Sequence, residues 1–302
     1  MTRPALTDWM LLLVVTFCFG SSFMAIEVAL QSVAPLWIAA ARITIGAMVL
    51  TIAAYATGAG LPDFSDEGRA QWKAVLPLGL VQNALPFGLI AWGQSYATSS
   101  FAGVAMSVTP LIILPLAHFL VPGDQITRRK ALGFFIGFIG TVVLIDPRGI
   151  LAAQGGPMLL WGRLAIMLAA CCYAVAAIMA RRMPTMPMLR LSATSLICAS
   201  AGILPVALVV EGIPAMPTTA SALAILWLSF LPTAMAVFLL VTLIKRVGPS
   251  FVAYVNYIVP IWAVVFGAVI LSEPIPPTFV TALALILAGV AVAQLRLRRA
   301  RR

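Results

Sequence analysis

Two adjacent amide side chains in the middle of an apolar stretch are candidates for binding a ligand. Gln82 and Asn83 lie near the centre of the stretch, and Pro86 follows within one helical turn. A proline leaves a helix carbonyl without its usual partner, and nearby amides can repair the helix or bind a ligand. Hydrogen bonding between helices and lining of a cavity therefore both stay open for these amides.

A denser polar cluster lies around residue 256. Asn256 is flanked by Tyr254 and Tyr257, with Pro260 one turn later and Trp262 just beyond. Tyrosine and tryptophan often mark the headgroup level of a membrane, but an amide beside a proline suits a binding site better. We therefore predict that this stretch supplies the main binding residues.

Charged residues inside the apolar stretches are few, and they suggest a pair. Glu27 lies near the end of the first stretch and Arg42 about two turns into the second, at a similar depth. These two residues would act as a structural clamp, as an outer gate or as a contact for a substrate carboxylate. Arg163 can extend toward the membrane surface, and His118 is a weak candidate for proton transfer.

The residue patterns of enzymes and metalloproteins are missing. The sequence has no phosphate-binding loop, no paired carboxylates at one depth, and no serine or cysteine placed with a histidine and an acid. The four cysteines lie in apolar stretches and form no ligand spacing with the single histidine. We expect no catalytic residue, no metal and no cofactor, and neither an enzyme nor an ATP-driven pump.

Composition indicates an all-α integral membrane protein, because 62% of the 302 residues are hydrophobic and only 9% are charged. A helix needs roughly 20 apolar residues to cross the hydrocarbon core. Ten stretches qualify, at about 9–30, 35–57, 73–95, 100–121, 130–146, 158–181, 189–210, 219–244, 250–271 and 276–295. Short loops join them, so no soluble domain is expected.

The distribution of positive charge predicts the orientation. With the N-terminus in the cytoplasm, all but three of the 19 Lys and Arg residues fall on cytoplasmic segments. Both termini are then cytoplasmic, as expected in a bacterial-type inner membrane. The basic tail from Arg296 to Arg302 suits anionic lipid headgroups, and we expect no binding to nucleic acid.

A repeated pattern divides the chain into two units. Ser100, Phe101 and Pro110 recur 150 residues later as Ser250, Phe251 and Pro260. Five helices per unit would invert the second copy, the architecture of many transporters with a site at the membrane midplane. We predict repeats at 1–150 and 151–302 around a central cavity, with Met106 and Ser107 facing Asn256 and Tyr257.

Small residues predict close packing of the fifth and tenth helices. Gly133 and Gly137 match Ala284 and Ala288 as faces with small residues four positions apart. Such faces pack within one chain or across a dimer, and the sequence does not separate the two. We expect a monomer.

The chain resembles the EamA-type branch of the drug/metabolite transporter superfamily. The resemblance rests on Phe19-Gly20-Ser21-Ser22-Phe23, Pro35 with Arg42, Ser100 and Phe101 with Pro110, and Pro260 followed by Glu273, Pro274, Ile275 and Gly289. Two positions depart from the family pattern: Asp124 stands where glutamate is usual, and Cys171-Cys172-Tyr173 where tryptophan or phenylalanine is frequent. Within the family, the chain is similar to the aromatic amino-acid exporters.

This resemblance implies a ten-helix basket around a central cavity and the export of amino acids or related metabolites. The residues expected to bind substrate are Gln82, Asn83, Trp92, Met106, Ser107, Tyr173, Tyr254, Asn256, Tyr257 and Trp262. Such a lining, without an acid or base at the midplane, suits a neutral zwitterion better than a phosphate compound. Planar cations, nucleosides, polyamines and small polar amino acids remain alternative substrates.

The expected mechanism is alternating access driven by the substrate gradient. Proton-coupled transporters usually keep an acid on the transport path inside the membrane, and Glu27 lies far from the centre. Facilitated export follows, with proton coupling as the alternative. Hinges are predicted at Pro86, Pro110, Pro115, Pro232 and Pro260.

Overall fold

A computed structural model describes residues 4–121, 125–145, 156–252 and 254–294, and the described chain is built from helices without strands. The first half contains α1 (Leu6–Leu30), α2 (Pro35–Ala56), α3 (Asp66–Gly79), η1 (Leu80–Ala84), α4 (Leu85–Gln94), α5 (Ser99–Met106), α6 (Thr109–Leu120) and α7 (Arg128–Ile145). The second half contains α9 (Gly156–Ala180), α10 (Met188–Glu211), α11 (Thr219–Leu228), η2 (Ser229–Met235), α12 (Ala236–Val247), α13 (Pro249–Val252), α14 (Val255–Val269) and α15 (Pro277–Gln294).

Length and composition identify membrane-crossing segments. Among the described residues, seven helical segments are long and apolar enough to cross a membrane: Leu6–Leu30, Pro35–Ala56, Asp66–Gln94, Ser99–Leu120, Gly156–Ala180, Met188–Glu211 and Thr219–Val247. Val255–Val269 and Pro277–Ala293 are shorter apolar helices. The protein is therefore a multi-pass membrane protein, as its composition predicts.

Two of these segments contain π-helical turns near their middle. In η1 the Leu85 amide donates to the Leu80 carbonyl, and in η2 the Ala236 amide donates to the Leu231 carbonyl, both five residues back. Such widened turns interrupt the helical register and occur often at functional sites. Pro86 lies in the first turn of α4, two residues after the end of η1, and Pro232 lies inside η2, so two of the predicted hinges lie at or beside these turns.

The predicted helices at 100–121 and 250–271 are each divided in the structure. The first is interrupted at Ser107 and Val108, and Pro110 lies in the first turn of α6, where the missing amide costs nothing. The second is divided between α13 and α14. Pro115 lies inside α6 and Pro260 inside α14, one turn or more after each interruption.

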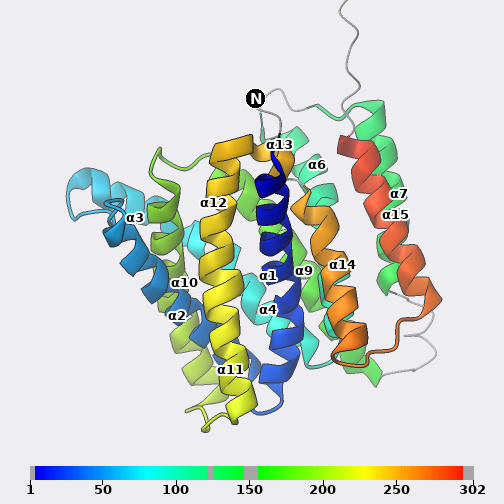
Figure 1. The fold of residues 1–302 in the computed structure, drawn as a ribbon, viewed down its shortest axis with the longest axis horizontal. Helices are drawn as coiled ribbons and strands as arrows, with labels where there is room; N and C mark the ends of the chain where they lie inside the picture. The colour runs from blue at the N-terminus through cyan, green and yellow to red at the C-terminus, as the bar shows by residue number, and fades with distance from the viewer. Residues whose placement is uncertain (1–3, 122–124, 146–155, 253, 295–302) are drawn as a thin grey trace, which may run out of the picture.

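The helices are arranged as a central bundle with further helices at each edge (Figure 1). Helices α7 and α15 lie together at one edge, while α2, α3 and α10 lie at the other; α1, α4, α9 and α14 are in the middle. A Cβ atom on Gly133 of α7 would lie 2.5 Å from the Gly289 carbonyl of α15 and 2.8 Å from the Ala293 side chain. The small residues of these two helices thus pack within one chain, through Gly289 and Ala293 on α15.

Some of the predicted features lie outside the described residues. They are the boundary at residue 150, Asp124, and the basic tail from Arg296 onward.

Candidate ligand-binding cavity

A cavity of about 430 Å³ lies between the two halves of the bundle. Its polar lining comes from Ser22, Arg42, Gln82, Asn83, Ser107, Tyr173, Ser192, Ser195, Thr233 and Asn256. Its apolar walls include Phe19, Phe23, Ile26, Phe87, Ile90, Met106, Leu196 and Val259. A volume of this size, with mostly apolar walls and a few polar groups, is typical of a small-molecule site.

Six of the ten residues expected to bind substrate line this cavity: Gln82, Asn83, Met106, Ser107, Tyr173 and Asn256. They come from η1, from the interruption between α5 and α6, from α9 and from α14. Segments distant in sequence thus meet at one site.

The two tyrosines beside Asn256 do not line the cavity. Tyr254 is exposed and packs on Trp9, with ring centroids 5.8 Å apart, and Tyr257 packs against the core and toward Tyr254. Helical spacing explains this, because residues three or four apart share a face. Asn256 therefore shares the cavity face with Val259 and Pro260, while the side chains of Tyr254 and Tyr257 lie outside the lining.

The two predicted tryptophans also face away from the cavity. Trp262 lies against α1, where a Cβ on Gly20 would approach its own Cβ to 2.3 Å, and its ring packs edge-on to Phe17. Trp92 packs on Tyr96, on the face of α4 opposite Ile90. Neither tryptophan is therefore part of the cavity lining.

The predicted ion pair between Glu27 and Arg42 is not formed. Arg42 is 4% exposed and lies on the cavity wall, where its Nε and Nη2 donate to Thr233 Oγ1 at 3.3 and 3.1 Å. Its guanidinium lies 3.9 Å from the centroid of the Phe87 ring. Similar depth on neighbouring helices was not enough for pairing, because Arg42 points into the cavity and Glu27 lines a different space.

The π-helical turn of η2 explains why Thr233 can hold Arg42. Pro232 has no amide hydrogen, so the Leu228 carbonyl four residues earlier loses its α-helical donor. The Thr233 hydroxyl donates to that carbonyl at 2.7 Å. The lone pairs of the Thr233 hydroxyl oxygen then accept the two hydrogen bonds from the Arg42 guanidinium.

Asn83 and Ser195 form a second polar contact on the wall. Asn83 Nδ2 donates to Ser195 Oγ at 2.8 Å, which joins η1 to α10. Our sequence reading missed Ser192, Ser195 and Thr233, because hydroxyl side chains are common inside membrane helices and carry a weak signal. The proline before Thr233 was the one usable indication.

A second depression, of about 490 Å³, lies at the end of the bundle where α1 ends; we call it the vestibule. It is lined by Glu27, Leu30, Gln31, Ser32, Val33, Ala34, Pro35, Gln94 and Ser95. Gln94 is buried and its Nε2 donates to the Phe23 carbonyl at 2.9 Å. Glu27 Oε2 and Gln94 Oε1 are buried acceptors without a protein donor in the described chain.

A thin barrier separates the vestibule from the cavity. Ile26 lines the cavity and the next residue, Glu27, lines the vestibule; on α4 the same holds for Ile90 and Gln94, one turn apart. One helical turn rises about 5.4 Å. Ile26 and Ile90 are almost fully buried, so apolar side chains separate the two spaces here.

Two carboxylates join the halves at the vestibule end. Glu273 accepts from the backbone amides of Ser99 and Ser100 at 2.8 and 3.0 Å, at the start of α5. Glu211 accepts from the amides of Leu36 and Trp37 at 3.0 and 3.1 Å, at the start of α2. Helix N-termini favour negative charge, so these contacts hold the second half against the first.

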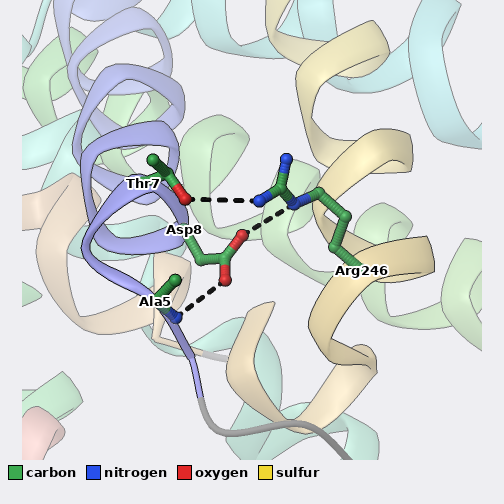
Figure 2. Close-up of polar contacts among 4 residues, drawn as sticks. All are labelled: Ala5, Thr7, Asp8 and Arg246. Carbon is green, nitrogen blue, oxygen red and sulfur yellow. Dashed lines mark hydrogen bonds and ion pairs between the residues drawn. The ribbon is translucent and has the colours of Figure 1, made fainter.

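At the opposite end, where α1 begins, the contacts depend on arginine side chains. Figure 2 shows Asp8 accepting from Arg246 Nε at 2.8 Å and from the Ala5 amide, with Thr7 also bound to Arg246. Arg246 is half exposed, and exposed ion pairs stabilise weakly. The cavity reaches this end at Ala180 and Met188, which are exposed.

Comparison with known proteins matches this architecture to a family. The model of the EamA-like transporter family matches residues 8–145 and 160–294, which is nearly the whole chain in two segments. YedA of Escherichia coli, an uncharacterized inner membrane transporter, is 24% identical over 252 residues, which are 82% of this chain and 78% of YedA.

A chloroplastic WAT1-related protein of Arabidopsis thaliana is 27% identical over 155 residues, or 51% of this chain. The match spans only 36% of that longer protein. A solved crystal structure superimposes with a TM-score of 0.66 and 21% identity, over 97% of this chain and 99% of the other. This last likeness concerns the fold.

Proposed function

Because the chain belongs to the EamA-like transporter family, we propose that it is a secondary transporter that exports aromatic or large neutral amino acids by alternating access. No nucleotide is hydrolysed in this mechanism. The observation that carries the proposal is the cavity of about 430 Å³ between the two halves, with apolar and aromatic walls around a few polar groups.

The walls suit both parts of such a substrate. Phe19, Phe23 and Phe87 offer apolar surface to a large side chain. Arg42 offers charged donors for a carboxylate. Asn83 Nδ2 donates to Ser195, and the side-chain oxygen of Asn83 can accept from an ammonium group. A phosphate compound would need several convergent cations, and Arg42 is the single charged residue on the described lining.

The proposed architecture is ten membrane-spanning helices in two inverted repeats, at 1–150 and 151–302, with both termini in the cytoplasm of a bacterial-type cell. Two findings support it: the family model matches two separate segments, and each half has one helix with a π-helical turn and a following helix that is interrupted. The protein functions as a monomer, since its small-residue faces pack within the chain.

Facilitated export agrees with the absence of an acid on the described cavity lining. Glu27 lies across the barrier, in the vestibule. Proton coupling through Glu27 is the alternative mechanism, and nucleosides, polyamines and planar cations are the alternative substrates.

A stabilisation screen tests the substrate class. Purified protein is heated with phenylalanine, tryptophan, leucine, a nucleoside, a polyamine or a planar cation, because a bound ligand raises the apparent Tm by mass action. We expect the large neutral amino acids to raise Tm and the others to leave it unchanged. A Tm increase with nucleosides or polyamines alone would refute the amino-acid proposal.

A further inference from the structure

Arg42 is a buried charge that lacks an opposite charge in its surroundings. It is 4% exposed, and no described carboxylate forms an ion pair with it. The described residues that line the cavity with Arg42 include no Asp or Glu. Its two partners, the Thr233 hydroxyl and the face of Phe87, are both neutral.

The geometry fixes the guanidinium while leaving donors available. Nε and Nη2 both donate to Thr233 Oγ1, and the ring of Phe87 lies 3.9 Å from the guanidinium carbon. These two contacts hold the plane of the group. Nη1 donates to no described protein acceptor, and the residue lines the cavity.

A charge in this position is costly for a protein embedded in a membrane. Burial of a cation is tolerated when an anion or several hydrogen bonds compensate it. Thr233 supplies a single neutral oxygen, which leaves most of that compensation to the contents of the cavity. A carboxylate is the natural partner, because its two oxygens match the donor geometry of a guanidinium.

We propose that Arg42 is the carboxylate anchor of the transport cavity, so that substrates must carry a carboxylate and amines without one are rejected. This inference rests on the proposed function and narrows it. Thr233 acts as a positioning residue, because it reaches the ligand through Arg42. The apolar part of the ligand then lies along Phe87 and the facing walls.

The sharpest probe is a matched pair of ligands, 3-phenylpropionate and 3-phenylpropionamide. They share the ring and the chain, and differ in carrying a carboxylate or a neutral amide. Binding of each to the full-length purified protein is measured near neutral pH by calorimetry, beside phenylalanine and phenylalaninamide. Hydrogen bonds to charged groups predict that wild-type protein prefers the carboxylate by about tenfold to a hundredfold.

Variants at two arginines separate anchoring from general structure. Arg42→Gln should bring the carboxylate-to-amide affinity ratio close to one, and Arg42→Lys should give an intermediate ratio, because it keeps the charge without the fork. Arg163→Gln is the matched control. Arg163 also lies in an apolar helix, but it donates to the Ile145 carbonyl outside the cavity, so the ratio should stay at the wild-type value.

The outcomes separate this inference from the function on which it rests. A wild-type ratio near one, with phenylalanine and phenylalaninamide bound equally, would overturn the anchor and leave the transporter proposal standing. If none of the probes and no amino acid binds the folded wild-type protein, the proposed substrate class fails and the anchor fails with it. The wild-type ratio decides the question even if Arg42→Gln does not fold.

Discussion

The cavity and the vestibule are lined by neighbouring residues of α1 and carry opposite charge. On the described linings, Arg42 is the charged residue of the cavity and Glu27 that of the vestibule, and neither has an ion-pair partner. Buried Ile26 and Ile90 separate them. A zwitterion leaving the cavity would therefore find its carboxylate held on one side and its ammonium attracted from the other.

The two ends of the bundle also differ in the contacts that hold the two halves together. The vestibule end is joined by Glu211 and Glu273, each bound to two backbone amides at a helix start. The end where α1 begins depends on the half-exposed Arg246, and the cavity extends to exposed residues there. The cavity thus extends toward the N-terminal end of the bundle.

The largest predicted effect is a difference in thiol labelling between the vestibule and the cavity when the reagent is added from outside the cell. In a background with all four cysteines replaced by alanine, Gln31→Cys places a thiol in the vestibule and Ser192→Cys places one in the cavity. A membrane-impermeant maleimide on intact cells should label the first and spare the second. Labelling of the cavity thiol alone would reverse the proposed orientation.

Thr233→Val tests whether the cavity depends on a positioned Arg42. The substitution keeps the shape and removes the acceptor of two guanidinium bonds. Because a hydrogen bond to a charged group contributes about 1.5–3 kcal/mol, the affinity for phenylalanine should fall about tenfold or more. The control is Thr242→Val in the same helical segment, Thr219–Val247, where the hydroxyl donates to the Phe238 carbonyl in an exposed bond. This variant should leave the affinity unchanged. Equal losses of affinity in both variants would contradict the positioning role of Thr233.

Glu27→Gln tests whether the vestibule carboxylate carries a proton during transport. Facilitated export predicts that the initial rate in proteoliposomes is the same with and without a pH gradient, in the wild-type protein and in Glu27→Gln alike. Strict dependence on the gradient, lost in Glu27→Gln, would establish proton coupling and rule out facilitation.

The smallest expected effect on transport comes from a substitution remote from both spaces. A valine at Gly133 would clash with the Gly289 carbonyl on α15, and such overpacking costs about 1–3 kcal/mol of stability. Thermal unfolding should show a lowered Tm, while the relative rates for different amino acids stay constant. Leu132→Val, at an exposed neighbour, is the control, and altered substrate preference in Gly133→Val would show that the α7–α15 pair shapes the cavity.

Much of the architecture follows from the sequence, because apolar length determines where helices lie. Asn83 and Asn256 both line the cavity, and their prolines and depth were the features that singled them out in the sequence. The direction of each side chain is harder to predict from the sequence. Helical spacing could have excluded Tyr254 and Tyr257 from the cavity lining, but it could not reveal the π-helical turn at Thr233. That turn brings the Thr233 hydroxyl to Arg42, where it accepts from the guanidinium on the cavity wall.

Counterflow in proteoliposomes tests whether the protein transports carboxylate-bearing amino acids through Arg42. Purified protein is reconstituted, the vesicles are loaded with unlabelled phenylalanine, and entry of labelled phenylalanine is followed without ATP or a pH gradient. We expect transient accumulation of label that Arg42→Gln abolishes and Arg163→Gln retains. No accumulation of phenylalanine, tryptophan or leucine by folded wild-type protein, with accumulation of an amine that lacks a carboxylate, would contradict this expectation.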